Sequence, residues 1–252
     1  MRLARICSCC LMLIVLMGEM ASAQKNCGVL NTALRSGEVL KYKVFYTLAG
    51  VYVGAGEAEF KIQVSKKTRG AFYLTGFGKT YSGYNWIYPV NDLYESVADS
   101  LTFEPYWFRR QIREGGRKKL EEFRMDRSRN EVLESNRRKK VSDCVTDVLS
   151  VIYYARCIPY QRYPTGAKIP IQLFLDGEEY PVYIRYLGKE KITTPYGTYQ
   201  TIKFKPLLLE GTLFTGGEQM TVWVTDDEQH MPVYVDTPIL VGHIRVYLGL
   251  PE

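Results

Sequence analysis

Hydrophobic and polar positions alternate along most of the chain beyond residue 37. Between residues 38 and 47, Leu40, Tyr42 and Val44 fall on one face and polar side chains fall mostly on the other. The longer segment 51–64 continues this pattern. A period of two is typical of a β-strand that has one face in water.

Further segments with the composition of strands follow at short intervals along the chain. They are 70–80, 91–99, 106–113, 117–126, 130–140, 168–175, 178–187, 189–194, 198–205, 220–225, 231–236 and 241–248. Short connections favour antiparallel neighbours, and a sheet of this size must curl, split or close. These segments are candidates, and we count 11 or more strands among them. We therefore predict a mainly β protein, with a large curved antiparallel sheet or an unclosed half-barrel of about 11 strands.

One segment, 143–157, has the spacing of a helix instead. Val145, Val148, Leu149 and Ile152 recur at i, i+3, i+4 and i+7. Ser142 or Asp143 is a suitable N-cap, and Pro159 ends the helix because the residue before a proline avoids helical angles. We expect this helix to pack inside the curved sheet and to bury Val148, Leu149 and Ile152.

The N-terminal segment 1–23 has the pattern of a signal peptide. Arg2 and Arg5 precede an apolar run that ends at Met17, and Ala21-Ser22-Ala23 is a small-x-small cleavage site. The sequence predicts cleavage after Ala23, export to the periplasm or beyond, and a single β-rich domain over 24–252. No later apolar run has the length of a transmembrane segment, and Gln24-Lys25-Asn26 does not resemble the site of a lipid anchor.

Three cysteines remain after this cleavage, namely Cys27, Cys144 and Cys157. A helix over 143–157 would hold Cys144 and Cys157 about 20 Å apart, too far for a disulfide. Cys27 then pairs with one of them or with neither. We favour Cys27–Cys144, and the role of Cys157 stays open. A metal site made from these scattered cysteines is not expected.

Positive charge is concentrated in residues 109–140, which contain 13 Lys and Arg against 6 Asp and Glu. The run Arg137, Arg138, Lys139 and Lys140 is its densest part, and it attracts anionic partners. Outside the cytoplasm such a partner is an anionic component of the envelope and not a nucleic acid. The alternative is a solvated hairpin that protects a sheet edge.

The sequence contains no motif for catalysis or for a cofactor. It lacks Gly-x-Ser-x-Gly and His-Glu-x-x-His, and its histidines are His230 and His243 alone. We predict a protein that is not an enzyme and has no cofactor or metal. A glycan-acting carboxylate pair stays open, because such a pair is defined by distance in space; Glu57 and Glu59 more simply belong to a wet strand face.

Aromatic side chains gather in the segment 81–88 and again near residue 107. Such side chains line apolar ligand pockets or fill a core. The candidates for lining a ligand site, together with the two helix residues that would form its wall, are Tyr81, Tyr84, Trp86, Tyr88, Trp107, Leu149 and Ile152.

These features together resemble a known family. The residues that carry the resemblance are Asn26-Cys27, Leu34-x-x-Gly37-Glu38-x-Leu40-x-Tyr42, Gly78-x-Thr80-Tyr81, Asp92-x-Tyr94-Glu95-Ser96, Cys144-x-x-Asp147-Val148-Leu149-Ser150-x-Ile152-Tyr153-Tyr154 and Glu218-x-Met220-Thr221-Val222-Trp223-Val224. The chain resembles the domain-of-unknown-function family numbered 3108, in the form found in exported proteins of Bacteroides-like bacteria. The resemblance implies that Cys27 and Cys144 belong together, and it assigns no catalytic residue. By analogy of fold alone, we expect the chain to be similar to the unclosed half-barrels of periplasmic lipoprotein carriers.

Two functional hypotheses follow. The first is a non-catalytic periplasmic protein that binds a lipid-like or other apolar ligand in its curved sheet. The second is a structural or adaptor protein of the envelope that docks through its basic hairpin. An open cavity lined by apolar side chains favours the first, and a filled concavity favours the second.

Overall fold

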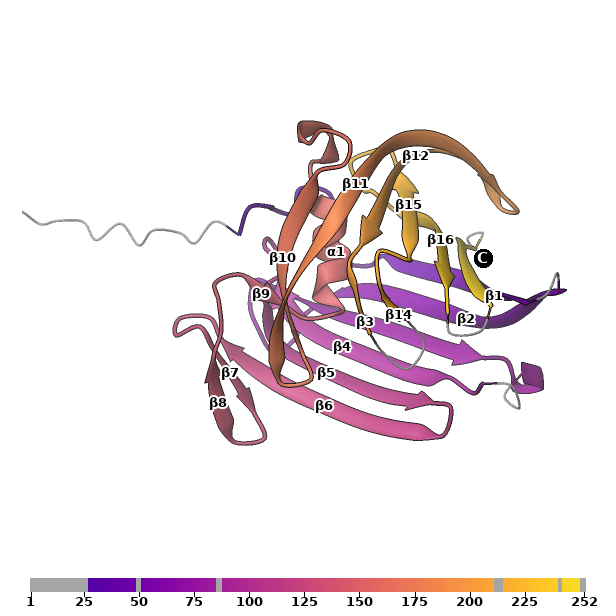
Figure 1. Cartoon of the computed structure of the whole chain (residues 1–252). Helices are drawn as coiled ribbons and strands as arrows, with labels where there is room; N and C mark the ends of the chain where they lie inside the picture. Colours follow the sequence, from indigo (N-terminus) through magenta and orange to yellow (C-terminus); the bar gives the residue numbers. More distant parts are fainter. Residues whose placement is uncertain (1–26, 49–50, 85–87, 211–214, 240–241, 250–252) are drawn as a thin grey trace, which may run out of the picture.

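The computed structural model describes residues 27–48, 51–84, 88–210, 215–239 and 242–249 of the 252-residue chain (Figure 1). The predicted signal segment, 1–23, lies outside these residues. The strands are β1 (Val39–Leu48), β2 (Val51–Val64), β3 (Ala71–Thr80), β4 (Asn91–Asp99), β5 (Pro105–Glu114), β6 (Arg117–Asp126), β7 (Glu131–Glu134), β8 (Arg137–Lys140), β9 (Val145–Thr146), β10 (Lys168–Leu175), β11 (Glu178–Thr194), β12 (Gly197–Pro206), β13 (Leu208–Glu210), β14 (Thr215–Gly217), β15 (Thr221–Thr225), β16 (Pro232–Pro238) and β17 (His243–Leu248). The α-helix is α1 (Ser150–Cys157), and short 3-10 turns span Ser82–Tyr84 and Tyr160–Arg162.

A single sheet contains all but two of the described strands. Its order is β8-β7-β6-β5-β4-β3-β2-β1-β17-β16-β15-β12-β11-β10-β9, while β13 and β14 pair only with each other. The pairings are antiparallel except that of β9 with β10, which is parallel. The sheet curls until the strands β10, β11, β12, β15 and β16 stand over β1–β6, but it does not close into a barrel (Figure 1). The predicted class, mainly β with a large unclosed sheet and one helix, is confirmed.

The predicted number of about 11 strands is wrong, because the sheet has 15 within the described part of the chain. Ser135 and Asn136 adopt positive φ angles of 45° and 65°, and they divide segment 130–140 into two short strands, β7 and β8. The strand β9 is only two residues long. Elements this short do not show an alternating pattern, so sequence periodicity undercounts them.

The predicted start of the helix at residue 143 is also wrong, since α1 begins at Ser150. Cys144 has a φ of 62°, a left-handed conformation that a helix cannot contain. Val145 and Thr146 pair with β10 as strand β9. The Asp147 carboxylate then accepts the backbone N–H groups of Leu149 and Ser150, each at 2.7 Å, and so takes the capping role expected of Ser142 or Asp143.

This later start changes which face of the helix is buried. Leu149 is only 1% exposed, as expected, and Tyr153 is equally buried. Val148 is half-buried. Ile152 is 37% exposed, so its predicted burial is wrong. The inner face instead carries Arg156, which is 2% exposed and paired with Glu38 at 2.5 and 2.8 Å.

Two apolar clusters meet at α1 and fill the space beside it. One cluster joins the helix to β10, β11, β12 and β15, and it includes Ile158, Ile184 and Phe204. The other joins it to β2–β6, and it includes Leu74 and Phe108. Figure 1 shows the helix enclosed between these two walls. The concavity around α1 is therefore core.

A disulfide ties the start of the described chain to the beginning of β9. Cys27 and Cys144 are bonded across 117 residues, with their Cα atoms 5.3 Å apart. The thiol of Cys157 takes no part in a disulfide, and burial raises its pKa to about 12. The stretch from Cys144 to Leu149 is not helical, so the distance argument against Cys144–Cys157 started from an incorrect helix boundary.

The two ends of the sheet meet through charged side chains. The buried guanidinium of Arg110 on β5 pairs with Glu121 on β6 and with Asp176, which lies in the β10–β11 turn. The backbone N–H of Asp176 donates to Glu121 at 2.6 Å. Side-chain contacts thus fasten the β10–β11 hairpin against β5 and β6, although no strand pairing links them. No described helix has the length and apolar character of a membrane-spanning segment.

Candidate functional site

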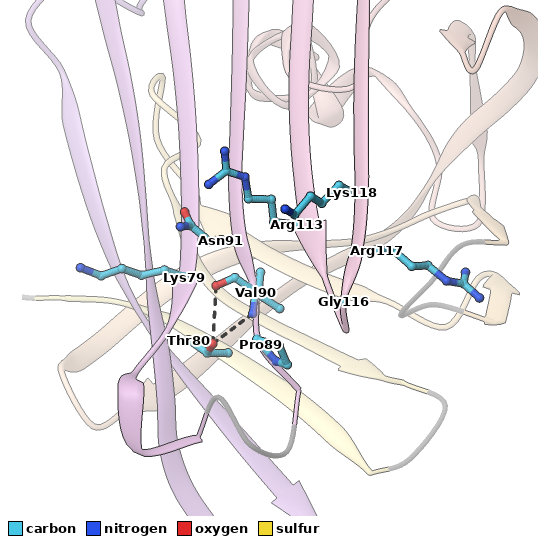
Figure 2. A pocket seen from close by; sticks show the side chains of 9 residues that line it. All are labelled: Lys79, Thr80, Pro89, Val90, Asn91, Arg113, Gly116, Arg117 and Lys118. Atoms are coloured by element: carbon cyan, nitrogen blue, oxygen red, sulfur yellow. Dashed lines mark hydrogen bonds between the residues drawn. The ribbon is translucent and has the colours of Figure 1, made fainter.

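A row of polar side chains crosses the ends of four neighbouring strands. The register sets Lys79 opposite Asn91 and Arg113 opposite Lys118. The pairing of β4 with β5 places Asn91 beside Arg113, so these polar residues form one row across β3–β6. These four residues and Arg117 line a cavity of about 290 Å³, together with Thr80, Pro89, Val90 and Gly116 (Figure 2). We call the five residues Lys79, Asn91, Arg113, Arg117 and Lys118 the cationic corner.

Local backbone structure fixes this arrangement. Gly115 and Gly116 join β5 to β6 with φ angles of 52° and 85°, which favour glycine. A Cβ on Gly115 would also lie 2.7 Å from the ring of Tyr88. At the neighbouring strand ends, the Val90 N–H donates to Thr80 Oγ1 at 3.0 Å, as Figure 2 shows. The turn and this bond hold the ends of β3–β6 beside one another.

The corner has an excess of positive charge. Lys79 pairs with Glu57 at 2.9 Å on the outer face of the sheet. Arg113, Arg117 and Lys118 are exposed and form no ion pair within the described residues. No carboxylate is among the described residues that line the cavity. Unpaired cations gathered around a hollow attract anions, because their fields add.

The run predicted to attract anions, on β8, is placed differently. Arg138 and Lys140 lie 3.3 and 3.0 Å from Glu131, and Lys139 pairs with Glu178 across the seam between the sheet ends. Its fourth member, Arg137, is exposed. Three of the four cations thus have a carboxylate partner, and this reduces the attraction of β8 for an external anion. A second cavity, of about 650 Å³, lies beside this run and is lined by Glu134, Asp176 and Glu178 as well as by its cations.

Two buried carboxyl groups lie behind the corner. Asp92 and Glu114 are 5% and 7% exposed, and the Arg113 backbone N–H donates to Asp92 at 2.8 Å. Burial, and secondarily a hydrogen bond with Glu114 and its charge, raise the pKa of Asp92 to about 7, against the lowering effect of the Arg113 N–H and of Arg110. Asp92 is therefore mostly protonated in mildly acidic solution, and Glu114, which the register sets opposite Arg117, is the second acidic group beside the corner.

The structure brings only some of the aromatic candidates together. Tyr81, Tyr84 and Tyr88 are half-buried near the end of β3, and Trp86 lies outside the described residues. The Trp107 indole donates to exposed Glu122 at 2.9 Å.

The helix candidates are also apart from that cluster. Leu149 lies in the core beneath Gly76, whereas Ile152 is on the exposed side of its helix.

Neither histidine joins a cluster of potential metal ligands within the described residues. His230 is buried, its Nδ1 lies 2.7 Å from the carbonyl oxygen of Arg156, and burial lowers the pKa of its ring. His243 is exposed beside Asp236. The three-member group of potential ligands contains the two bonded cysteines, Cys27 and Cys144, with Glu104. Cysteines in a disulfide have no thiolate to offer a metal.

Sequence reasoning placed Arg113, Arg117 and Lys118 in the basic block but did not single them out. The Gly115-Gly116 pair in a run of charged residues was the available signal, since it predicts a tight turn that brings its flanking cations together. Lys79 comes from a distant part of the chain, and only strand pairing joins it to the others.

Comparison with known proteins identifies the family. Residues 41–249 match the family described as "Protein of unknown function (DUF3108)". The chain belongs to this family. A search of curated proteins finds no match.

Among solved structures, a β-barrel-like protein of the domain-of-unknown-function family DUF1849 from Brucella abortus aligns with a TM-score of 0.55 and 6% identity, over 84% of this chain and 94% of that one. A DUF1089 family protein from Pseudomonas aeruginosa aligns with a TM-score of 0.38 and 14% identity, over 77% and 95% of the two chains. The first likeness extends to the fold alone.

Proposed function

We propose that this DUF3108 protein is a non-catalytic, exported docking protein that binds an anionic component of the cell envelope through the cationic corner. One observation carries the proposal: Arg113, Arg117 and Lys118 line a cavity of about 290 Å³ and form no ion pair with any carboxylate of the described residues. Cations that are already neutralised within a protein contribute little to binding, whereas exposed unpaired cations attract an oppositely charged partner and increase its association rate.

The filled concavity favours docking over the carriage of an apolar ligand. The two apolar clusters leave α1 in contact with side chains on both walls of the sheet. Lys79, Arg113 and Lys118 instead alternate with inward-facing positions of their strands, so they lie exposed on the outer face at the strand ends, where a large partner can reach them. The export assumed here rests on the N-terminal segment 1–23.

The docking proposal is tested with two charge-matched triple variants. One replaces Arg113, Arg117 and Lys118 by Gln, and the other replaces Arg137, Arg138 and Lys140 by Gln. Both variants lose three positive charges, so a difference in the salt concentration at which they elute reports the position of the charges and not the net charge of the protein. On a heparin column, the corner variant should elute at clearly lower salt than the wild type, and the β8 variant should stay close to it. Equal elution of the wild type and the corner variant would refute the proposal.

A second candidate function, binding of an apolar ligand, keeps one supporting observation. Val44 on β1, Val246 on β17 and Val235 on β16 occupy one register row and are each only half-buried. Their row continues that of core residues such as Val222. Native mass spectrometry of protein purified from its own envelope tests this candidate: a retained lipid mass would favour it over docking.

A further inference from the structure

We infer that the anionic component recognised by the cationic corner is the surface of a lipid bilayer with anionic headgroups. This inference rests on the proposed docking function and names the partner of the same site. It comes from a second row of side chains that runs beside the cations on the outer face. A soluble anion bound to the cations would gain nothing from contact with this second row.

The second row is mainly apolar. Phe77 on β3 faces Leu93 on β4, and Gln111 on β5 faces Leu120 on β6. Leu93 also faces Gln111, so the four residues form one continuous line across the strands. Leu120 is 62% exposed, while Phe77 and Leu93 are half-buried. A single exposed leucine is ordinary on a protein surface, but a row of apolar side chains is less so.

The two rows lie next to each other on the same face. Lys118 and Leu120 are two residues apart on β6, as are Lys79 and Phe77 on β3. Side chains two apart on a strand point the same way and lie about 7 Å from each other. A surface that approached the row of cations would therefore also touch Leu120.

This pairing matches the chemistry of a bilayer surface. Peripheral proteins bind anionic membranes through basic side chains at the headgroups together with apolar side chains that enter the acyl boundary. Lys and Arg side chains extend to the headgroups while their aliphatic parts stay in apolar surroundings. The cavity between Lys79, Arg113 and Lys118 offers space beside the cations for a headgroup phosphate. An acidic protein or glycan would use the cations but gain little from Leu120.

The test compares binding to lipid vesicles with binding to heparin. Vesicles of phosphatidylcholine, with or without phosphatidylglycerol, are sedimented with the exported protein and its variants. Each cation near an anionic membrane contributes on the order of fivefold in partitioning, and two of the three replaced cations, Arg113 and Lys118, lie in the outer row, so the corner triple variant should bind the anionic vesicles about 25-fold more weakly. Leu120→Gln should weaken binding to these vesicles about 10-fold and leave elution from heparin unchanged.

A matched control separates the row from general surface hydrophobicity. Val64 is 64% exposed at the end of β2, away from the corner. Val64→Gln should leave both vesicle binding and elution from heparin unchanged. Circular dichroism and thermal melting should show that both single variants stay folded, because neither side chain is buried.

The outcomes distinguish the inference from the function on which it rests. If the wild type does not sediment with anionic vesicles, or if Leu120→Gln sediments with them as much as the wild type does, the bilayer inference is wrong. The docking proposal still stands in that case, provided that the corner variant elutes early from heparin; an acidic protein or glycan is then the partner. If the corner variant elutes like the wild type, docking itself is wrong.

Discussion

Shortening Leu149 to alanine tests the placement of the helix in the sheet. Leu149 is 1% exposed and belongs to the apolar cluster that joins α1 to β2–β6. Its backbone N–H is bonded to Asp147, and this bond does not depend on the leucine side chain. Leu149→Ala therefore removes buried packing and leaves the start of the helix intact.

The expected cost follows from how tightly the site is enclosed. A Cβ on Gly76 would lie 3.1 Å from Leu149 Cδ1, so the backbone of β3 packs directly on the leucine. A sheet backbone paired on both sides cannot move in to fill the space, and the variant keeps most of the resulting cavity. Losses from fully buried Leu→Ala changes run from about 2 to 5 kcal/mol, and we expect about 3 to 4 here.

Urea unfolding with the disulfide intact measures this loss, and thermal melting should show a lowering of about 6 to 16 °C. Ile152→Ala is the matched control, since it removes a side chain of equal size from the same helix at a site that is 37% exposed. It should cost less than about 1 kcal/mol. A loss below that value for Leu149→Ala, or equal losses for both variants, would refute the placement of α1 described here.

Three further predictions concern ionisable groups and cysteines. The pKa of Asp92 is raised from 3.8 to about 7 in the folded protein, so protonated Asp92 stabilises the fold fully below about pH 4, and this stabilisation is lost as the pH rises through 7. The urea concentration at the unfolding midpoint should therefore fall over that pH range, and it should fall less in Asp92→Asn; an equal fall in both proteins would contradict the raised pKa. Burial raises the pKa of the Cys157 thiol to about 12, so iodoacetamide at neutral pH should alkylate it slowly in the native protein and rapidly after unfolding; rapid labelling of both states would show an accessible thiol. Peptide mapping without reduction should yield a Cys27–Cys144 peptide and no Cys27–Cys157 peptide, and replacing both bonded cysteines by Ser should cost up to about 4 to 5 kcal/mol, the chain-entropy value for a long loop.

Period-two alternation was sufficient to predict the main strands and the fold class, and the i, i+3, i+4 spacing was sufficient to predict the presence of one helix. Each of these depends on side chains that point alternately to water and to the core, and that pattern is written in consecutive residues. Strands of only a few residues could not be predicted in this way, because they are too short to show an alternating pattern. Val145 and Thr146 became part of a predicted helix because their apolar character fits either element, and only the neighbouring β10 makes them a strand.

The tertiary structure alone decided which cations are available to a partner. Lys139 and its partner Glu178 are 39 residues apart in the chain, and the seam between the sheet ends brings them together. Lys79 joins Arg113 and Lys118 only through the register of β3, β4 and β5. A sequence gives the number of charges in a block, but whether each is neutralised depends on through-space distances of a few ångströms. The basic block was therefore predictable from the sequence, and the corner within it was not.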